Sequence, residues 1–212
     1  MASRPQPAPG TTDAVRLAEP ADVPALTRML VRAYMDDPVA VWICKSSQLR
    51  AKLLAALYSE RLRQLLAHEA VWTNPEHASA AVWIPPDHQQ ATIRPTAALL
   101  RCFSRPQMMA RVPLLAVGFA AMQRKHPRSP RHWYLSLLGT DPDTQGHGFG
   151  STVLQPVLER CDSDGVGAYL ESSKPRNLDF YARFGFRVTD ELVLPQGPKM
   201  WPMWREPSDA GR

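Results

Sequence analysis

The segment at positions 141–151, which reads DPDTQGHGFGS, has the residues best suited to holding a ligand. Gly146, Gly148 and Gly150 alternate with other residues between a predicted strand and a predicted helix. Glycine has no Cβ, so the backbone can approach a bound group closely. The first turn of the following helix offers unpaired N–H groups and the positive end of its dipole. These features together predict a pyrophosphate site.

Other phosphate motifs fit this segment less well. A P-loop needs Gly-Lys followed by Ser or Thr, and that run is missing here. The dinucleotide-binding fingerprint needs the spacing G-x-G-x-x-G, whereas the glycines after Gln145 follow G-x-G-x-G. Glycines can also serve a turn alone, so the segment by itself leaves the ligand open.

A second motif stands at 177–186, where the chain reads NLDFYARFGF. With QGHGFG at 145–150, it resembles the paired motifs Q/R-x-x-G-x-G/A and N-x-x-F-Y-x-x-x-G-F of the GCN5-related N-acetyltransferase (GNAT) superfamily. LGTDP at 138–142 resembles the end of that superfamily's signature strand. The likeness covers 13–205, is strongest over 132–205, and is closest to puromycin N-acetyltransferase-like members.

The resemblance implies an acetyltransferase that uses acetyl-coenzyme A (acetyl-CoA). The implied fold is the α/β acyl-CoA N-acyltransferase fold, a mixed central sheet flanked by helices with splayed strands around the coenzyme. The pantetheine arm would pair with open backbone groups of Leu138, Gly139 and Thr140, much as an added strand does. Asn177 would contact the coenzyme or cap its helix.

The resemblance also implies which residues hold the pyrophosphate. Gln145 stands where arginine is usual, so the basic stretch at 94–131 or His147 would supply some of the missing attraction. The implied set is Gln145, Gly146, His147, Gly148, Phe149, Gly150 and Ser151.

Tyr181 falls at the position of the superfamily's general acid. Transfer to an amine releases a thiolate, which needs a proton. A thiol pKa near 8.5 and a tyrosine pKa near 10 make that proton transfer nearly balanced. The alternative is a core aromatic, because Phe180, Phe184 and Phe186 surround Tyr181 in the sequence.

The acceptor side is expected to need a base, since an alkyl ammonium must lose a proton before it attacks. Glu171, at the end of a predicted strand, is the first candidate. Asp36 and Asp37 lie in a predicted helix-to-helix loop and could instead hold a cationic amine. Tyr34, Trp83 and Trp133 are candidates for lining the acceptor pocket, although aromatic residues also build cores.

The elements that must position these residues follow from apolar periodicity and from breaker residues. Pro113 is expected to kink or divide its helix, Gly185 to cap one, and Pro202 to place its strand at an edge or a bulge. Predicted strands cover 14–18, 71–73, 80–84, 132–140, 167–172, 186–189 and 198–204. The first predicted helix begins after Asp22 and ends at 34, and the others cover 49–68, 96–102, 106–125, 148–161 and 177–184.

The length suits one domain, the order of strands and helices indicates α/β construction, and the resemblance places that domain at 13–205. A disordered tail is expected at 1–12 and a C-terminal tail at 206–212. The net charge of +5 is modest and does not require nucleic acid. Cys44, Cys102 and Cys161 show no disulfide or zinc spacing, and no histidine pair has metal-ligand spacing. Without a signal peptide or a spanning stretch, the chain is expected to be cytoplasmic, as a monomer or homodimer.

The function predicted from these features is acetylation of an amine on a small molecule, such as an antibiotic or natural product, in resistance or tailoring. The rivals are acetylation of a protein lysine or N-terminus, a non-catalytic acyl-CoA sensor, and a nucleic-acid-binding protein that uses the basic stretch.

Overall fold

The computed structural model describes residues 15–88 and 94–208. Its centre is an eight-stranded sheet in the order β1-β2-β3-β4-β5-β8-β6, with β7 paired to β8. Only β4 and β5 run parallel, so the sheet is mixed as predicted. The strands are β1 (Arg16–Leu17), β2 (Val71–Thr73), β3 (Ser79–Ile84), β4 (His132–Thr140), β5 (Gly167–Ser172), β6 (Arg187–Val188), β7 (Leu192–Val193) and β8 (Lys199–Arg205).

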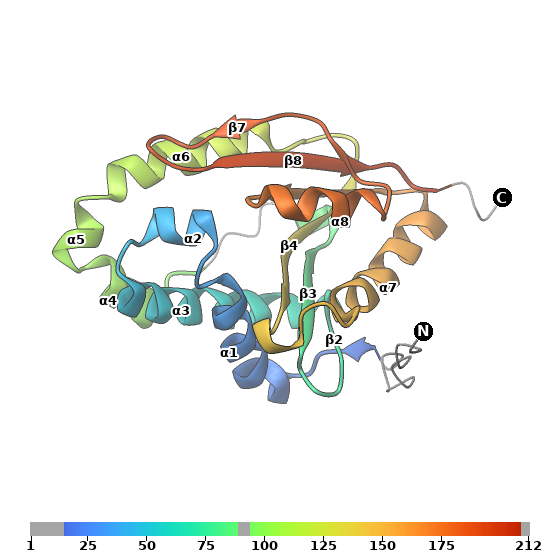
Figure 1. Cartoon of the computed structure of the whole chain (residues 1–212), viewed down its shortest axis with the longest axis horizontal. Helices are drawn as coiled ribbons and strands as arrows, with labels where there is room; N and C mark the ends of the chain where they lie inside the picture. Colours follow the sequence, from blue (N-terminus) through green and yellow to red (C-terminus); the bar gives the residue numbers. More distant parts are fainter. Residues whose placement is uncertain (1–14, 89–93, 209–212) are drawn as a thin grey trace, which may run out of the picture.

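Helices cover the sheet on both sides. The helices are α1 (Val23–Tyr34), α2 (Pro38–Ile43), α3 (Ser47–Leu66), α4 (Ala97–Phe103), α5 (Pro106–Met109), α6 (Val112–Lys125), α7 (Phe149–Asp164) and α8 (Leu178–Ala182). Helices α1 and α3 pack on β3, and α7 lies on the other side of the strands (Figure 1). The main core between these layers includes Leu30, Leu62, Trp83 and Val153, each with essentially no exposed surface.

A second apolar cluster explains how the segment after position 94 packs, which the sequence leaves unresolved. Trp42 of α2, Leu99 of α4, Met108 of α5 and Leu115 of α6 are all buried in it. Its remaining members include Met200 of β8. This cluster packs α6 against α2 and β8.

Two local features differ from the sequence prediction, and a third agrees with it. Helix α2 was not predicted, because it has only six residues; Asp37 caps it and Pro38 occupies its first turn. Strand β7 is a two-residue strand that was also missed. The predicted division of the helix over 106–125 is confirmed: it is split into α5 and α6, with Pro113 in the first turn of α6.

Pro202 lies inside the sheet, which corrects the edge-or-bulge prediction. Strand β8 pairs with β5 on one side and with β6 and β7 on the other, and Pro202 is opposite Glu171. The carbonyl of Pro202 accepts a hydrogen bond from the backbone N–H of Thr189. In a strand, the backbone N and C=O of one residue both point toward the same neighbouring strand. The missing N–H therefore faces the short break between β6 and β7, where no ladder partner is lost.

Asp22 precedes α1 as predicted, but its carboxylate bonds elsewhere rather than capping that helix. Arg16 donates two hydrogen bonds to it, at 2.7 and 2.9 Å, and the backbone N–H of Glu19 donates at 2.8 Å. His77 Nε2 lies 2.7 Å from the same carboxylate. These bonds, chiefly that of Arg16, hold the pKa of Asp22 far below its usual range.

We expect Asp22→Asn to lower the free energy of unfolding by about 2 kcal/mol, since buried charge-assisted bonds are lost. A carboxylate whose folded pKa is depressed stabilises the fold above its unfolded pKa, and this stabilisation disappears as the pH falls. The difference between variant and wild type should therefore shrink below about pH 4 in urea titrations. Asp143→Asn, which alters a carboxylate that is 80% exposed, is the control with little expected effect.

Some sequence predictions concern residues outside the described ranges, namely the tail at 1–12 and the end of the C-terminal tail. Within the described residues, all three cysteines are buried and free. Among the same residues, no helix has the length and apolar character needed to cross a membrane.

Candidate active site

Strands β4 and β5 separate halfway along their length, and this separation opens the cleft. Their pairing ends at Leu135 opposite Leu170. Beyond that point β4 pairs only with β3, and β5 only with β8. The register of β4 against β3 shifts by one residue at Ser136, which is a β-bulge. A bulge bends its strand and increases the local twist, so it accounts for the divergence of β4 from β5.

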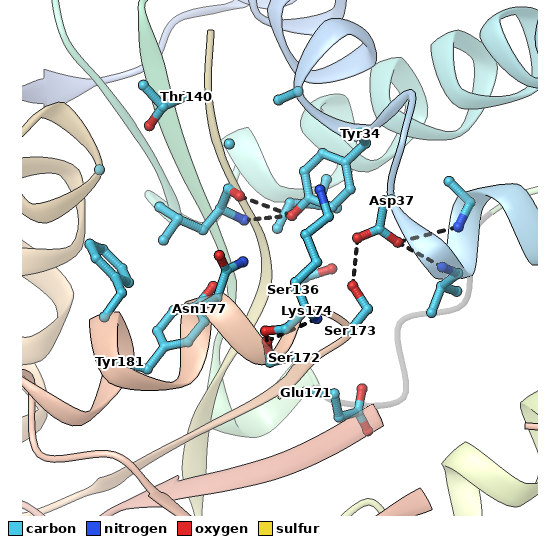
Figure 2. A pocket seen from close by; sticks show the side chains of 18 of the residues that line it. Tyr34, Asp37, Ser136, Thr140, Glu171, Ser172, Ser173, Lys174, Asn177 and Tyr181 are labelled. Carbon is cyan, nitrogen blue, oxygen red and sulfur yellow. Dashed lines mark hydrogen bonds between the residues drawn. The ribbon is translucent and has the colours of Figure 1, made fainter. Parts of the chain in front are cut away.

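The cleft between the separated strands has a volume of about 690 Å³. Its walls come from α1, α2, α3, α6, α8, the two strands and the loop before α7. Figure 2 shows Tyr34 and Asp37 on one side, and Asn177 and Tyr181 on the facing helix. Residues far apart in the chain therefore share one cavity.

The glycine-rich loop lies at the edge of this cleft, as predicted. Gly146 and Gly148 both have a φ of 86°, and Gly148 caps the N-terminus of α7. A Cβ at either position would meet no atom within 4 Å, so the loop faces open space. The residues of the loop that line the cleft are Gln145, Gly146, Gly148, Phe149, Gly150 and Ser151.

Two details of the predicted cradle are corrected. The backbone N–H of Ser151 donates to the carbonyl of Gly148 at 2.8 Å, so the helix already uses it. His147 is exposed and is not among the cleft residues; its Nδ1 lies 3.1 Å from the carbonyl of Thr144. The side chain of Gln145 donates to the carbonyl of Thr140 at 3.3 Å, which ties the loop to β4.

The basic side chains of the stretch at 94–131 do not line the cleft. From that stretch, only Phe119 and Met122 line the cleft. Lys174, Arg176 and Arg183 line it instead. The guanidinium of Arg183 lies over the ring of Phe180, 5.4 Å from its centre, and Phe180 is a neighbour of Gly150. The cations that sequence reasoning missed come from the segment between β5 and β6.

Alternate residues of β4 direct their backbone groups to the cleft side, which corrects the prediction for Gly139. The carbonyl of Gly139 accepts from Ser79 Oγ of β3 at 3.0 Å, so it faces away from the cleft. Leu138 directs its backbone to the cleft side, but Tyr34 Oη accepts from its N–H at 3.1 Å and donates to its carbonyl at 3.0 Å. Neither group of Leu138 is open, so the prediction for this residue is corrected as well. The carbonyl of Thr140 faces the loop through Gln145.

Tyr181 lies on α8, where its ring packs in the core and the residue also lines the cleft. Its ring contacts Phe180 and Phe186, at centroid distances of 5.2 and 6.0 Å, and 8% of the residue is exposed. Burial, with a smaller effect of Asp37, raises the pKa of its hydroxyl. Tyr181 therefore belongs both to the core and to the lining of the cleft, and its role as general acid stays a prediction.

Asn177 precedes α8 and lines the cleft, and its side chain makes no capping hydrogen bond. Its side chain is labelled beside Tyr181 in Figure 2. Of the two roles considered for it, the cap is not seen, and contact with a ligand stays a prediction.

Glu171 lines the cleft just past the point where β4 and β5 separate. Its carboxylate accepts from Tyr134 Oη at 2.9 Å and from Tyr169 Oη at 3.0 Å. The side chain is only 6% exposed, and His126 Nδ1 lies 3.9 Å from Oε1. Sequence reasoning missed Tyr134, Tyr169 and His126, although the alternation of strands predicts that residues 169 and 171 share a face.

Asp37 lines the cleft, but both of its oxygens already have partners. Oδ1 accepts from the N–H groups of Val39 and Ala40, and Oδ2 accepts from Ser173 Oγ. Asp36 is exposed and is not among the cleft residues. The predicted binding of a cationic amine is therefore not supported for Asp36, whereas for Asp37 it stays a prediction.

Trp83 and Trp133 belong to the core rather than to the acceptor pocket. Trp83 has no exposed surface, and Trp133 is 4% exposed. Trp133 follows the alternation of β4 to the face opposite Tyr134, where Arg160 of α7 lies over its ring at 5.2 Å. Tyr34, by contrast, does line the cleft.

No group of three or more His, Cys, Asp or Glu residues suited to a metal ion occurs among residues 15–88 and 94–208.

Comparison with known proteins agrees with this geometry. Residues 108–206 match the family model described as an acetyltransferase (GNAT) domain. An uncharacterized N-acetyltransferase of Schizosaccharomyces pombe is 26% identical over 94% of this chain and 85% of its own.

Solved structures share the whole fold. One titled as histone acetyltransferase HPA2 and related acetyltransferase, from Corynebacterium glutamicum, has a TM-score of 0.64 and 24% identity, covering 93% of this chain and 98% of that one. An agmatine N-acetyltransferase has a TM-score of 0.58 and 16% identity over 91% and 98%. The fold is the α/β fold of the GNAT acetyltransferases. The chain is similar to N-acetyltransferases of that superfamily, a class of enzymes that uses acetyl-CoA.

Proposed function

We propose that this enzyme acetylates an amine of a small molecule by direct attack on acetyl-CoA in a ternary complex. One observation carries the proposal: the cleft between the separated strands brings the glycine loop, Tyr181 and the buried carboxylate of Glu171 together. An amine-bearing molecule can enter the same cavity as the thioester.

The roles of the residues follow from this arrangement. The loop at 145–150 and the start of α7 would hold the pyrophosphate, with Arg176 and Arg183 adding positive charge. The amine nitrogen attacks the thioester carbonyl, and the carbon–sulfur bond breaks as the sulfur leaves. Tyr181 gives its proton to that sulfur, and Glu171 accepts the proton that the ammonium must lose before attack.

The environment of Tyr181 refines the simple comparison of pKa values. Because burial raises its pKa, Tyr181 keeps its proton throughout the neutral range. The same shift makes donation to a thiolate less favourable than the ordinary values suggest. Tyr181 therefore suits a proton transfer that occurs as the sulfur departs, when the developing thiolate charge lies close to the hydroxyl.

The side chains that line the cleft around Tyr134 and Glu171, where we place the amine, favour a small acceptor with apolar parts. Leu57 of α3, Phe119 and Met122 of α6, and Met200 of β8 line the cleft near Tyr134 and Glu171. Helix α6 thus closes one side of the cleft. A peptide substrate would need that side to be open, as a groove. The motifs similar to puromycin N-acetyltransferase-like members, and the agmatine enzyme of the same fold, suggest antibiotic or natural-product amines, with resistance or tailoring as the biological role.

A panel of amines tests this proposal directly. The panel would hold aromatic amines, aliphatic polyamines, aminoglycosides, puromycin and short peptides with free N-termini, each mixed with acetyl-CoA. Release of free thiol and the acetylated product by mass spectrometry are the readouts. We expect acetylation of one or more small amines and not of the peptides. Acetylation of peptides alone would overturn the acceptor assignment, and thiol release with none of the amines would count against the proposed reaction.

A further inference from the structure

We propose that the outer sides of α4, α5 and α6 form a docking surface for an anionic lipid bilayer. This surface, the basic-apolar face, combines exposed apolar side chains with exposed arginines on or next to the same helices. The inference does not depend on the acceptor of the proposed reaction. The apolar members of the face are Leu100, Met109, Val112 and Val117, and the basic members are Arg101, Arg105, Arg124 and Arg128.

Helix α6 is apolar on the side where a surface helix is ordinarily polar. The run from Val112 to Met122 has no polar side chain, yet only Leu115 and Gly118 of this helix are buried. A helix that is apolar all round is normally covered on all sides. The helical repeat places four exposed residues on the side opposite Gly118. They are Val112, Ala116, Val117 and Ala120.

Helices α4 and α5 extend this apolar surface. Leu100 and Met109 are each 60% exposed, although their sequence neighbours Leu99 and Met108 are buried in the second apolar cluster. Leu115 of α6 belongs to the same cluster, so all three helices pack on it. Figure 1 shows α4 and α5 at one end of the molecule, with α6 running on from them. Apolar side chains gathered on an outer surface mark an interaction site.

The charge of this region selects an anionic partner. The sequence has no Asp or Glu between His88 and Thr140. From outside that stretch, Asp87 forms an ion pair with Arg131, and Asp190 forms one with Lys125. The four arginines of the basic-apolar face take part in none of the ion pairs of the described residues. Their positive charge is therefore available to an anionic surface.

An anionic bilayer satisfies both the apolar and the basic side chains. Its surface accepts apolar side chains at the boundary between headgroups and acyl chains, while arginines contact lipid phosphates. In a symmetric dimer the same patch meets itself, so the arginines of two copies would face each other. Nucleic acid would neutralise the arginines, but its phosphates offer no apolar environment to Leu100, Met109 and Val117.

The test is flotation of the full chain with vesicles of phosphatidylcholine, alone or mixed with phosphatidylglycerol at roughly 7:3. We expect the wild type to bind the mixed vesicles at least about tenfold more tightly than the neutral ones. A first variant replaces Arg101, Arg105 and Arg124 with Gln. Its affinity for the mixed vesicles should fall about a hundredfold, because each basic residue near the surface contributes roughly fivefold.

A second variant, with Gln at Leu100, Met109 and Val117, should bind the mixed vesicles at least about tenfold more weakly, since apolar insertion is lost. None of these three residues lines the cleft, and melting curves check that both variants fold. The matched control makes the same change of charge away from the face and should bind within about threefold of the wild type. It replaces three exposed arginines, Arg28, Arg63 and Arg187, with Gln.

Several results would overturn the proposal. The wild type would fail to bind the mixed vesicles, would bind both lipids equally, or would lose no more affinity in the first variant than in the control. Sedimentation velocity of the protein alone tests a second copy: a dimer that the second variant dissociates would make the face an interface between copies. Duplex DNA that binds more tightly than the vesicles, and only with the arginines intact, would assign the face to nucleic acid.

Discussion

Tyr181→Phe is expected to lower kcat by a factor of about 100 to 10,000, the usual contribution of a positioned general acid. The substitution removes only the hydroxyl group. The ring can keep its contacts with Phe180 and Phe186, because these involve its faces and edges rather than its oxygen. The fold and the loop at 145–150 should therefore be unaffected.

Steady-state kinetics at saturating acetyl-CoA would measure the loss, with calorimetry of CoA binding and a melting curve as controls. We expect a coenzyme Kd within about twofold of the wild type, since the hydroxyl acts after binding. The raised pKa of Tyr181 also predicts that its deprotonation causes no loss of wild-type activity below about pH 10. Full activity of the variant would show that another group protonates the sulfur.

Gly148→Val is expected to weaken CoA binding by about a hundredfold or more, equivalent to roughly 2.7 kcal/mol. Gly148 caps α7 with a φ of 86°, a conformation that a β-branched residue adopts only with strain. The added side chain would occupy the open space in front of the loop, where we place the pyrophosphate. Calorimetry with CoA measures the effect.

The matched control is Gly165→Val, at the other end of the same helix. Gly165 also has a positive φ, of 65°, and a Cβ there likewise meets no atom within 4 Å. Both variants should lose a similar amount of stability through backbone strain, roughly 1–2 kcal/mol. Only Gly148→Val should lose affinity for the coenzyme. Equal affinities in the two variants would remove the phosphate site from this loop.

The sequence alone predicted most of the elements and the place of the glycine loop between β4 and α7. The boundaries of α1, β2, β4 and β5 lie within a residue of the structure, because strong apolar periodicity and breaker residues define them. The glycine loop was readable for the same reason, since backbone conformation depends on residues that are adjacent in the chain.

The acceptor end was the part that the sequence misassigned. Trp83, Trp133 and Asp36 have side chains of the right type, but strand alternation and local exposure direct them away from the cleft. The groups that surround Glu171 come from α6, β4 and β5, and no local motif links them. Short elements such as α2 also escaped prediction, because six residues carry too little periodicity.

What the sequence determined by itself is therefore the local chemistry: a glycine loop before a helix, a tyrosine in a recognisable motif, and a carboxylate at a strand end. The tertiary structure decided which of these groups share a cavity. The bulge at Ser136 separates β4 from β5, the second apolar cluster holds α6 beside the opening, and the packing of His126 against two tyrosines places it beside Glu171. These arrangements depend on contacts between residues distant in the chain, for which the order of residues gives no direct signal.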